Sequence, residues 1–431
     1  MRDYRRSEAM YQRAVKTIPQ GSQTFSKSAQ NFVHGAAPLF LERGRGARVF
    51  DVDGQEYIDY ILALGPVILG YADPDVNAAI VAQLERGISF TLTSELEAEL
   101  SELLCELIPC AQMTRFAKTG SDVTSGAIRI ARAATGRDRV AVCGYHGWHD
   151  WYIGSTARHL GVPAAVRELT STFAFNDAAS LAAVLDAYPS EYAAVMLEPT
   201  GAIAPQAGFL EEVAALTRSH GAVLVFDEIV TGFRTDMGGA QARYGVVPDL
   251  ACFGKGMANG MPLAALTGSR HLMEMMADVF VSGTFGGETL SLAASIATLR
   301  KLKRTDAVRR MHDTGAKLKA EAQRIIERHD LQATLSMIGD DWRPVLSVME
   351  AQAGSTLVMS LVRQETAQAG LLFGSGFTLC LEHTDNVIVE QTLVRWDVAL
   401  GAIARALALN NPHEALRGRA VQNAFAVRKS T

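Results

Sequence analysis

Two residues of opposite charge, Asp227 and Lys255, follow apolar segments that have the composition of buried strands. Asp227 ends the run 222–227, and Lys255 comes just after the run 249–253, 28 residues further along. Because parallel strands bring their carboxyl ends to one edge of a sheet, we expect these side chains to lie close together. Taken singly, Asp227 is better explained as a helix N-cap and Lys255 as an exposed loop lysine, but their shared position indicates a site.

Two glycine-containing turns add further candidate residues. Gly120 and Ser121 run directly into an amphipathic helical segment, and the N-terminus of a helix suits a phosphate group. The Gly-Lys-Thr order of a P-loop is absent, and an N-cap alone would also explain this turn. In the segment 144–147, Tyr145 lies between glycines and can stack on a planar ligand, although a packing tyrosine is the alternative.

One cofactor suits all four features together. Pyridoxal phosphate (PLP) carries an aldehyde for a lysine amine, a ring nitrogen for an aspartate and a phosphate for a helix N-terminus. The acid keeps the ring nitrogen protonated, and the lysine can bind the aldehyde and then transfer a proton. The sequence therefore predicts a PLP site.

The elements that must position these residues are visible from about residue 112 onward, where short apolar runs alternate with helical segments. Runs that are continuously apolar are typical of strands buried on both faces, as in a parallel sheet between helices. The predicted strands are 139–143, 192–198, 222–227 and 249–253. The predicted helices are 3–17, 74–86, 94–107 and 288–329, the last broken near residue 305, and Asp53-Gly54 predicts a hairpin.

Composition limits the classes of protein that fit. The chain has 431 residues, 48% of them apolar and 20% charged, which indicates a globular protein with a large core. A formal charge of -5 is not the basic footprint of a nucleic-acid binder. The longest apolar run, 60–69, is too short to span a membrane, and residues 1–21 do not form a signal peptide. Five scattered cysteines without a C-x-x-C pair predict free thiols in a reducing cytosol and no metal site.

Longer motifs extend this picture. The sequence resembles the class III PLP-dependent aminotransferases of fold type I, most of all their glutamate-1-semialdehyde 2,1-aminomutase branch. Matching segments cover residues 38–296 almost continuously and include TGSDVTSGAIRIARAATGRDRV, GYHGWHDWY, VLVFDEIVTGFR and SGTFGGETLSLAA. The resemblance implies an α/β fold whose large domain has a mostly parallel seven-stranded sheet between helices, with a smaller α+β domain. We expect a large PLP-binding domain at 61–310, and a small domain formed by 311–431 with the N-terminal segment 1–60.

The same resemblance implies the roles of individual residues. Lys255 would bind the cofactor and Asp227 would pair with its ring nitrogen. Ile229 and Tyr145 would pack against the two faces of the ring. The other implied contacts are Gly120 and Ser121 on the phosphate, Asp122 and His146 nearby, Glu198 in a supporting position, and Thr284 reaching the phosphate of the neighbouring subunit.

Members of this family are cytoplasmic homodimers that act on a small-molecule amino donor and a carbonyl acceptor, without nucleic acid or membrane partners. Three departures concern the substrate end of the site. Lys27 is the only cation near the position of an aminomutase arginine, Ser375 lies where that enzyme has an acid, and Glu288 replaces the usual asparagine. Lysine cannot form the two parallel bonds that arginine makes with a carboxylate.

We therefore predict intermolecular amino transfer from a donor such as glutamate to an unusual aldehyde or ketone, for example a sugar-derived one. The aminomutase reaction is the first alternative, and a decarboxylase or racemase with the same cofactor stays open. A PLP-binding regulator or a structural paralogue are the non-enzyme alternatives. The intact Lys255 and Asp227 argue against a paralogue, and residues 1–35 are too short for an added DNA-binding domain.

Overall fold

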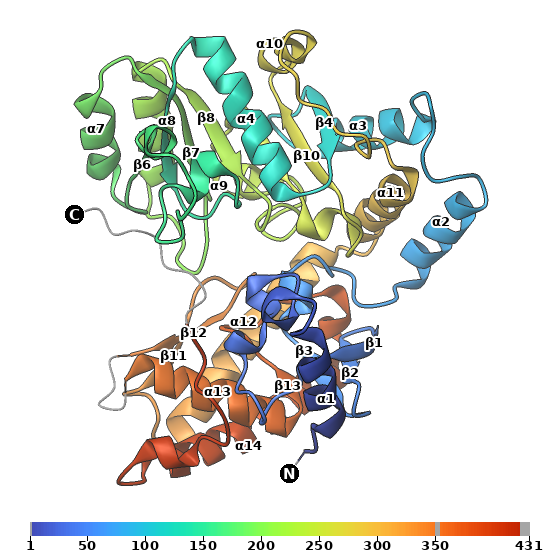
Figure 1. Ribbon diagram of the computed structural model, residues 1–431, viewed down its shortest axis with the longest axis vertical. Helices are drawn as coiled ribbons and strands as arrows, with labels where there is room; N and C mark the ends of the chain where they lie inside the picture. The colour runs from blue at the N-terminus through green and yellow to red at the C-terminus, as the bar shows by residue number, and fades with distance from the viewer. Residues whose placement is uncertain (1, 350–353, 423–431) are drawn as a thin grey trace. The chain divides into compact units, whose positions relative to one another are not determined.

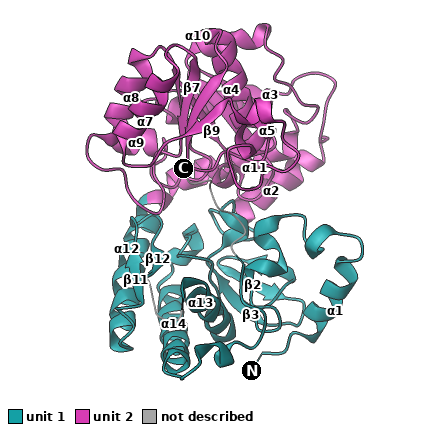
Figure 2. Ribbon diagram, turned by 60° about the vertical axis from the view of Figure 1, so that its left-hand side comes forward, with its two compact units in different colours: residues 1–73, 309–424 teal, residues 74–308, 425–431 magenta. Residues whose placement is uncertain are grey.

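The computed structural model describes residues 2–349 and 354–422, which form two compact units (Figure 2). One unit runs to Asp73 and resumes at Arg309, and the other runs from Pro74 to Val308. These limits differ from the predicted boundaries at residues 60 and 310. The N-terminal segment extends through Asp73 because Tyr71 exchanges backbone hydrogen bonds with Gly46 and its hydroxyl donates to Asp59. Residues 423–431 of the predicted small domain lie outside the described residues.

The unit from Pro74 to Val308 contains a seven-stranded sheet of order β4-β10-β9-β8-β7-β5-β6. Only β10 runs antiparallel to its neighbours among these strands, so the sheet is mostly parallel, as expected. Its strands are β4 (Met113–Ala117), β5 (Arg139–Cys143), β6 (Thr170–Thr172), β7 (Tyr192–Leu197), β8 (Val223–Asp227), β9 (Leu250–Phe253) and β10 (Ala264–Gly268).

Helices pack on this sheet, and the four predicted strands appear as β5, β7, β8 and β9 (Figure 1). Every residue of β7, β8 and β9 is buried, as strands covered on both faces require. The helices of this unit are α2 (Pro74–Leu84), α3 (Glu95–Leu107), α4 (Gly120–Thr135), α5 (Asp150–Ile153), α6 (Ala164–Arg167), α7 (Ala178–Ala187), α8 (Phe209–Ser219), α9 (Ala240–Tyr244), α10 (Arg270–Met273) and α11 (Thr289–Arg304).

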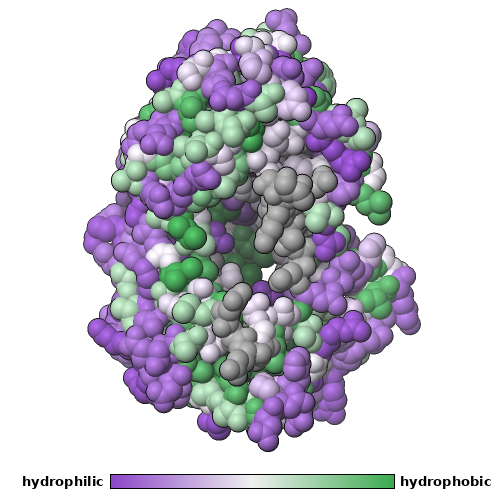
Figure 3. All heavy atoms as spheres, turned by 90° about the vertical axis from the view of Figure 1, so that its left-hand side faces the viewer, coloured by the Kyte–Doolittle hydropathy of each residue, from purple (hydrophilic) through white to green (hydrophobic). Residues whose placement is uncertain are grey.

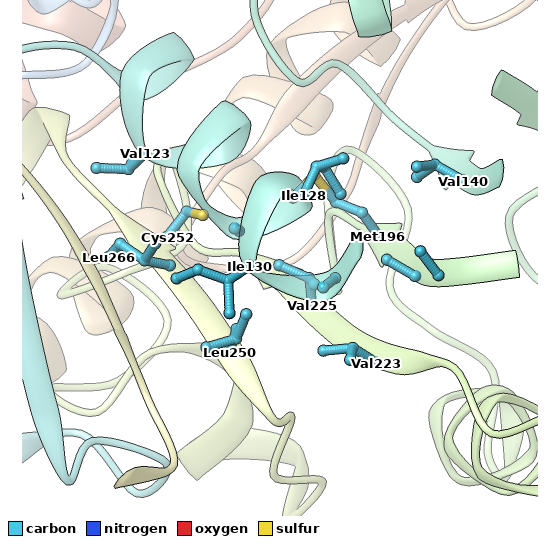
Figure 4. Packing of buried hydrophobic residues seen from close by; sticks show 14 of the residues in the cluster. Val123, Ile128, Ile130, Val140, Met196, Val223, Val225, Leu250, Cys252 and Leu266 are labelled. Atoms are coloured by element: carbon cyan, nitrogen blue, oxygen red, sulfur yellow. The ribbon is translucent and has the colours of Figure 1, made fainter. Parts of the chain in front are cut away.

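Helix α4 covers the middle of the sheet and carries the candidate phosphate turn at its start. Its apolar stripe, with Val123, Ile128 and Ile130, packs against side chains such as Val225 and Leu250 of the central strands (Figure 4). Burying side chains of this size stabilises the fold by about 1.5–3 kcal/mol each. The first turn of α4 is therefore held rigidly at the carboxyl edge of β7, β8 and β9.

The other unit is an α+β structure built from both ends of the chain. Its main sheet has the order β1-β2-β3-β13, in which β3 and β13 pair in parallel, and Asp53-Gly54 forms the predicted hairpin between β2 and β3. The predicted long helix is broken after Thr305. The elements are α1 (Arg5–Ala14), β1 (Leu41–Arg45), β2 (Arg48–Asp51), β3 (Glu56–Asp59), α12 (Ala307–Arg328, which crosses the boundary), β11 (Leu335–Ile338), β12 (Val345–Val348), α13 (Ser355–Ala369), β13 (Leu371–Leu372) and α14 (Asn386–Leu407).

Hydrophilic and hydrophobic side chains are interspersed on the face drawn in Figure 3. Among the helices of the described residues, none has both the length and the apolar composition that crossing a membrane demands. The five cysteines are free thiols.

Candidate active site

The carboxylate of Asp227 lies at the end of β8 and is buried against a histidine. His146 Nδ1 lies 2.8 Å from Asp227 Oδ2, and the amide of Ile229 donates to Oδ1 at 3.1 Å. The other ring nitrogen of His146 donates to the carbonyl of Cys143 at 3.1 Å. The predicted residues Asp227, His146 and Ile229 are thus brought together, and hydrogen bonds fix the orientation of the carboxylate.

Lys255 follows β9, the parallel neighbour of β8, with Asp227 in register with Cys252. The backbone of Lys255 has φ 42°, in the left-handed region that a residue with a side chain seldom occupies. Such conformations cost on the order of 1–3 kcal/mol and cluster at functional sites. The strained backbone conformation is that of Lys255 itself, since the preceding Gly254 is extended at φ -179°.

Glu198 follows β7 at the same edge of the sheet. One of its oxygens accepts a hydrogen bond from the Tyr145 amide at 3.2 Å. Burial and the negative charge of Asp227 raise the pKa of Glu198, while His146 and Lys255 act in the opposite direction. The edge of the sheet thus concentrates two acids and two bases that influence each other electrostatically.

The start of α4 forms an anion cradle. Thr119 is the N-cap, and the Asp122 carboxylate accepts from the Thr119 amide at 2.8 Å, completing a capping box. Within the described residues, the amides of Gly120 and Ser121 make no hydrogen bond. Asp122 is therefore engaged in shaping the turn, and two amides stay available for an anion.

Glycine is required on both sides of this cradle. A Cβ on Gly120 would lie 2.5 Å from Ile229 Cδ1, so Ile229 packs directly against the turn. Gly147 has φ 103°, and a Cβ there would lie 2.4 Å from Ser121 Oγ. The missing side chains bring the backbone of α4 close to Ile229 and to the segment after β5, as a small planar ligand with a phosphate requires.

The contacts of two predicted residues, Tyr145 and Thr284, do not by themselves define the roles predicted for them. Tyr145 is half-exposed and makes an edge-on ring contact with Tyr152, with centroids 5.6 Å apart. Thr284 lines a cavity of about 490 Å³ that Lys118 and Asp122 also line. No hydrogen bond joins Thr284 to Gly120 or Ser121 in the part of the chain that the structure describes.

Sequence reasoning missed two residues that support the site. The hydroxyl of Thr124 donates to the carbonyl of His146 at 2.8 Å, and Tyr152 donates to the carbonyl of Gly144 at 2.7 Å. Thr124 holds the 144–147 segment against α4, and Tyr152 holds it against α5. The only available signal for Thr124 was its position one turn after Gly120 on the same helix.

The residues at which the chain departs from the aminomutase pattern lie in two places. Lys27 is exposed at the end of a short 3₁₀ turn (Phe25–Lys27), and Ser375 is exposed beyond β13, both in the unit built from the two chain ends. Glu288 caps α11 in the other unit and forms an ion pair with Lys118.

Comparison with known proteins identifies the family. The class-III aminotransferase family matches residues 30–340. The chain belongs to this family. It is 36% identical to the 3-aminobutyryl-CoA aminotransferase of Cloacimonas acidaminovorans over 88% of this chain and 93% of that protein. It is also 36% identical to a glutamate-1-semialdehyde 2,1-aminomutase of Roseiflexus castenholzii over 94% of this chain and 99% of that protein.

Solved structures agree with the fold. The FumI protein of Sphingopyxis sp. MTA144, determined with PLP, superposes with a TM-score of 0.89 at 31% identity, covering 96% of this chain and all of that one. The chain is accordingly a PLP-dependent class III aminotransferase of fold type I, acting on a small-molecule amino donor and acceptor. The free amides of Gly120 and Ser121, the buried Asp227 and the strained Lys255 are a donor set that fits PLP.

Proposed function

We propose that this aminotransferase moves an amino group between two molecules, from a donor such as glutamate to an aldehyde or ketone. The amino-transfer chemistry rests on the buried Asp227–His146 pair, which shares one sheet edge with Lys255 and the cradle at Gly120. Transfer between two molecules rests on the residues Lys27 and Ser375. When bound, PLP supplies an electron sink that stabilises negative charge on the substrate carbon. All other steps are performed by side chains of the chain.

Each side chain has one task in this scheme. Lys255 Nζ holds the cofactor and afterwards moves the proton between the two carbons that exchange the amine. Asp227 faces the protonated ring nitrogen, and His146 keeps that carboxylate oriented. The further proposed cofactor contacts are Gly120 and Ser121 on the phosphate, Asp122 shaping their turn, Ile229 and Tyr145 on the ring faces, and Glu198 beside them.

Two copies are proposed to share each site, with Thr284 of one copy reaching the phosphate held by the other. The support is the exposure of the aromatic side chains around Thr284, since Phe280 is 78% and Phe285 is 59% exposed. Large apolar side chains left in water favour association, and obligate interfaces bury roughly 2,000 Å² or more. The free cysteines support a cytoplasmic location for such a homodimer.

The aminomutase reaction is the second candidate, because relatives of both kinds are equally similar to this chain. Intermolecular transfer is favoured because Lys27 and Ser375 replace the arginine and the acid of the aminomutase pattern. Assaying the holoenzyme with glutamate-1-semialdehyde alone, and then with aldehydes plus glutamate, separates the two. Rapid formation of 5-aminolevulinate without an added donor would show that the protein is an aminomutase. Turnover only in the presence of a donor would support the proposal.

A further inference from the structure

A little-exposed ion pair joins the two segments that the proposed shared site uses. Lys118 Nζ lies 3.0 Å from Glu288 Oε2, and their side chains are only 21% and 12% exposed. Lys118 immediately precedes Thr119, the N-cap of α4, and its own amide donates to Asp122 at 3.3 Å. The lysine is therefore part of the turn that presents Gly120 and Ser121.

Glu288, the acidic partner of this ion pair, is fixed at the start of α11. It is the N-cap of α11, where Oε1 accepts from the Leu290 amide at 2.6 Å and Oε2 accepts from the Ser291 hydroxyl at 2.6 Å. Burial acts to raise the pKa of Glu288, but the hydrogen bonds from Ser291 and Lys118 outweigh it and lower this pKa. The carboxylate is thus fixed in position and ionised.

The segment that carries Thr284 ends at Glu288, and its last two glycines lie close to neighbouring elements. The Gly286 amide donates to the carbonyl of Gly283 at 3.0 Å, and a Cβ on Gly286 would lie 3.1 Å from the Phe116 carbonyl of β4. A Cβ on Gly287 would lie 2.6 Å from Glu97 of α3. This segment therefore lies against β4 and α3. The Lys118–Glu288 ion pair joins its end to the turn before α4, and Arg129 of α4 donates to the carbonyl of Phe280 at 3.0 Å just before the segment begins.

We propose that the Lys118–Glu288 ion pair is a positioning device that couples the phosphate cradle of one copy to the segment, residues 283–287, that this copy offers to its partner. The inference rests on the proposed function, in which Thr284 crosses to the second copy. Loss of either charge displaces the cradle and the segment together, so cofactor affinity and dimer affinity fall together.

Substitution of Glu288 distinguishes this arrangement from one in which Lys118 binds the phosphate directly. If Lys118 were a phosphate ligand restrained by Glu288, then Glu288→Gln would release the lysine and leave PLP affinity unchanged or improved. If the pair is a positioning device, Glu288→Gln and Lys118→Met weaken PLP binding in the same direction. The double variant then loses no more PLP affinity than the single variant that binds PLP more weakly, because the effects of residues that act as one unit are not additive.

The test measures two equilibria that do not depend on turnover. PLP dissociation constants come from titration of each cofactor-stripped variant by absorbance, and dimer dissociation constants come from sedimentation of the holoenzyme over a concentration series. We expect each single variant to weaken both by about tenfold or more, the loss expected when a partly buried charge is left unpaired. Lys118→Arg, which keeps the charge, should stay near wild type.

Two controls separate the ion pair from general effects on α11. Lys303→Met and Glu106→Gln remove an exposed pair between α11 and α3, with side chains 58% and 59% exposed, and should change both constants less than twofold. Glu288→Asn keeps a capping side chain but not the contact with Lys118, and should be as weak as Glu288→Gln. Wild-type affinities in Glu288→Asn, or in both single variants, would overturn the inference. Circular dichroism identifies any variant that fails to fold, in which case Lys118→Met carries the test.

Failure of the proposed function gives a different result. A monomeric wild-type holoenzyme, or undiminished PLP affinity in Thr284→Ala, would refute the shared site and the ion-pair inference with it. A dimeric wild type with weak PLP binding in Thr284→Ala, together with unaffected Lys118 and Glu288 variants, would refute the ion-pair inference alone.

Discussion

His146 and Asp227 form a buried pair in which the histidine has oxygen atoms against both ring nitrogens. Nδ1 lies 2.8 Å from Asp227 Oδ2, and Nε2 donates to the Cys143 carbonyl at 3.1 Å. Because the carbonyl can only accept, Nε2 is a donor, and the ring is held from both sides by oxygen atoms. The ring is thereby fixed so that the carboxylate keeps one orientation.

The first prediction is that His146→Leu lowers kcat/KM by roughly 10- to 100-fold, since a hydrogen bond to a charged group contributes about 1.5–3 kcal/mol. His146→Asn retains a donor and should recover part of this loss. Steady-state kinetics and PLP titration of both variants check the result. Equal activity in His146→Leu and wild type would show that Asp227 needs no positioning partner.

The second prediction concerns the acid itself. Asp227→Asn should fold normally yet lose about a thousandfold or more in kcat, because a neutral amide does not balance a protonated ring nitrogen and such an effect is worth several kcal/mol. Asp236→Asn is a matched change at an exposed position of the same loop and should be neutral. Turnover close to wild type in Asp227→Asn would remove Asp227 from the catalytic residues.

The sequence was sufficient to predict the central strands, since β7, β8 and β9 are continuously apolar and their carboxyl ends carry Glu198, Asp227 and Lys255. Strands β4 and β10 were not individually recognisable. β4 includes Thr114 and Arg115, and β10 consists mainly of small residues, so neither has the apolar run of a buried strand. Their place in the sheet follows from tertiary pairing.

Contacts between segments that are distant in the chain could not be predicted from the sequence, because they too depend on tertiary structure. His146 and Asp227 are 81 residues apart, and nothing in either motif indicates that the ring faces the carboxylate. The Lys118–Glu288 ion pair joins residues 170 positions apart. Charge and residue type limit which groups can pair, but only the fold selects the pairs that form.

The third prediction is that borohydride reduction of the holoenzyme fixes PLP on Lys255, as read by peptide mapping. Lys255→Ala should show no fixed cofactor and lose at least the 10²- to 10⁴-fold that positioned proton transfer contributes. Lys303→Ala, an exposed lysine of α11, serves as the control. Fixed cofactor on another lysine would exclude the strained residue after β9 as the attachment point.

The fourth prediction uses a second buried acid, Glu228, which organises the loop that starts with Ile229. It accepts hydrogen bonds from the amides of Ala240 at 2.8 Å and Gln241 at 2.9 Å. Burial outweighs these bonds and raises the pKa of Glu228 above its ordinary 4.5. Because the folded state then binds the proton more tightly than the unfolded state, the stability linked to this proton is present below pH 4.5 and lost as the pH rises through the folded-state pKa.

Glu228→Gln removes this titration. The stability of wild type relative to Glu228→Gln should therefore decline as the pH is raised from 4.5 and become constant above the folded-state pKa. Thermal unfolding midpoints of holoenzyme at a series of pH values measure the difference, with Glu211→Gln on the surface of α8 as the control. A difference that does not change with pH would mean that Glu228 titrates alike in both states.

The fifth prediction tests Lys27, which together with Arg343 is one of two candidate cations for binding the substrate carboxylate. Lys27 ends a 3₁₀ turn that is held from behind, since Asn31 donates to the Phe25 carbonyl at 2.7 Å and Arg363 donates to the Asn31 carbonyl at 2.7 Å. The backbone at residue 27 should therefore keep its place when the side chain changes. A guanidinium can grip a carboxylate with two parallel bonds, whereas the ammonium of lysine acts as a point charge.

Lys27→Arg should accordingly raise kcat/KM for glutamate-1-semialdehyde by up to roughly tenfold, the equivalent of about 1.4 kcal/mol. Lys27→Met should raise KM for glutamate as donor while leaving PLP affinity unchanged, because residue 27 is not among the proposed cofactor contacts. Lys16→Met, a change at an exposed lysine earlier in the chain, controls for the loss of surface charge. If Lys27→Met leaves KM for every carboxylate substrate unchanged, another cation serves the carboxylate, and Arg343 is the next residue to substitute.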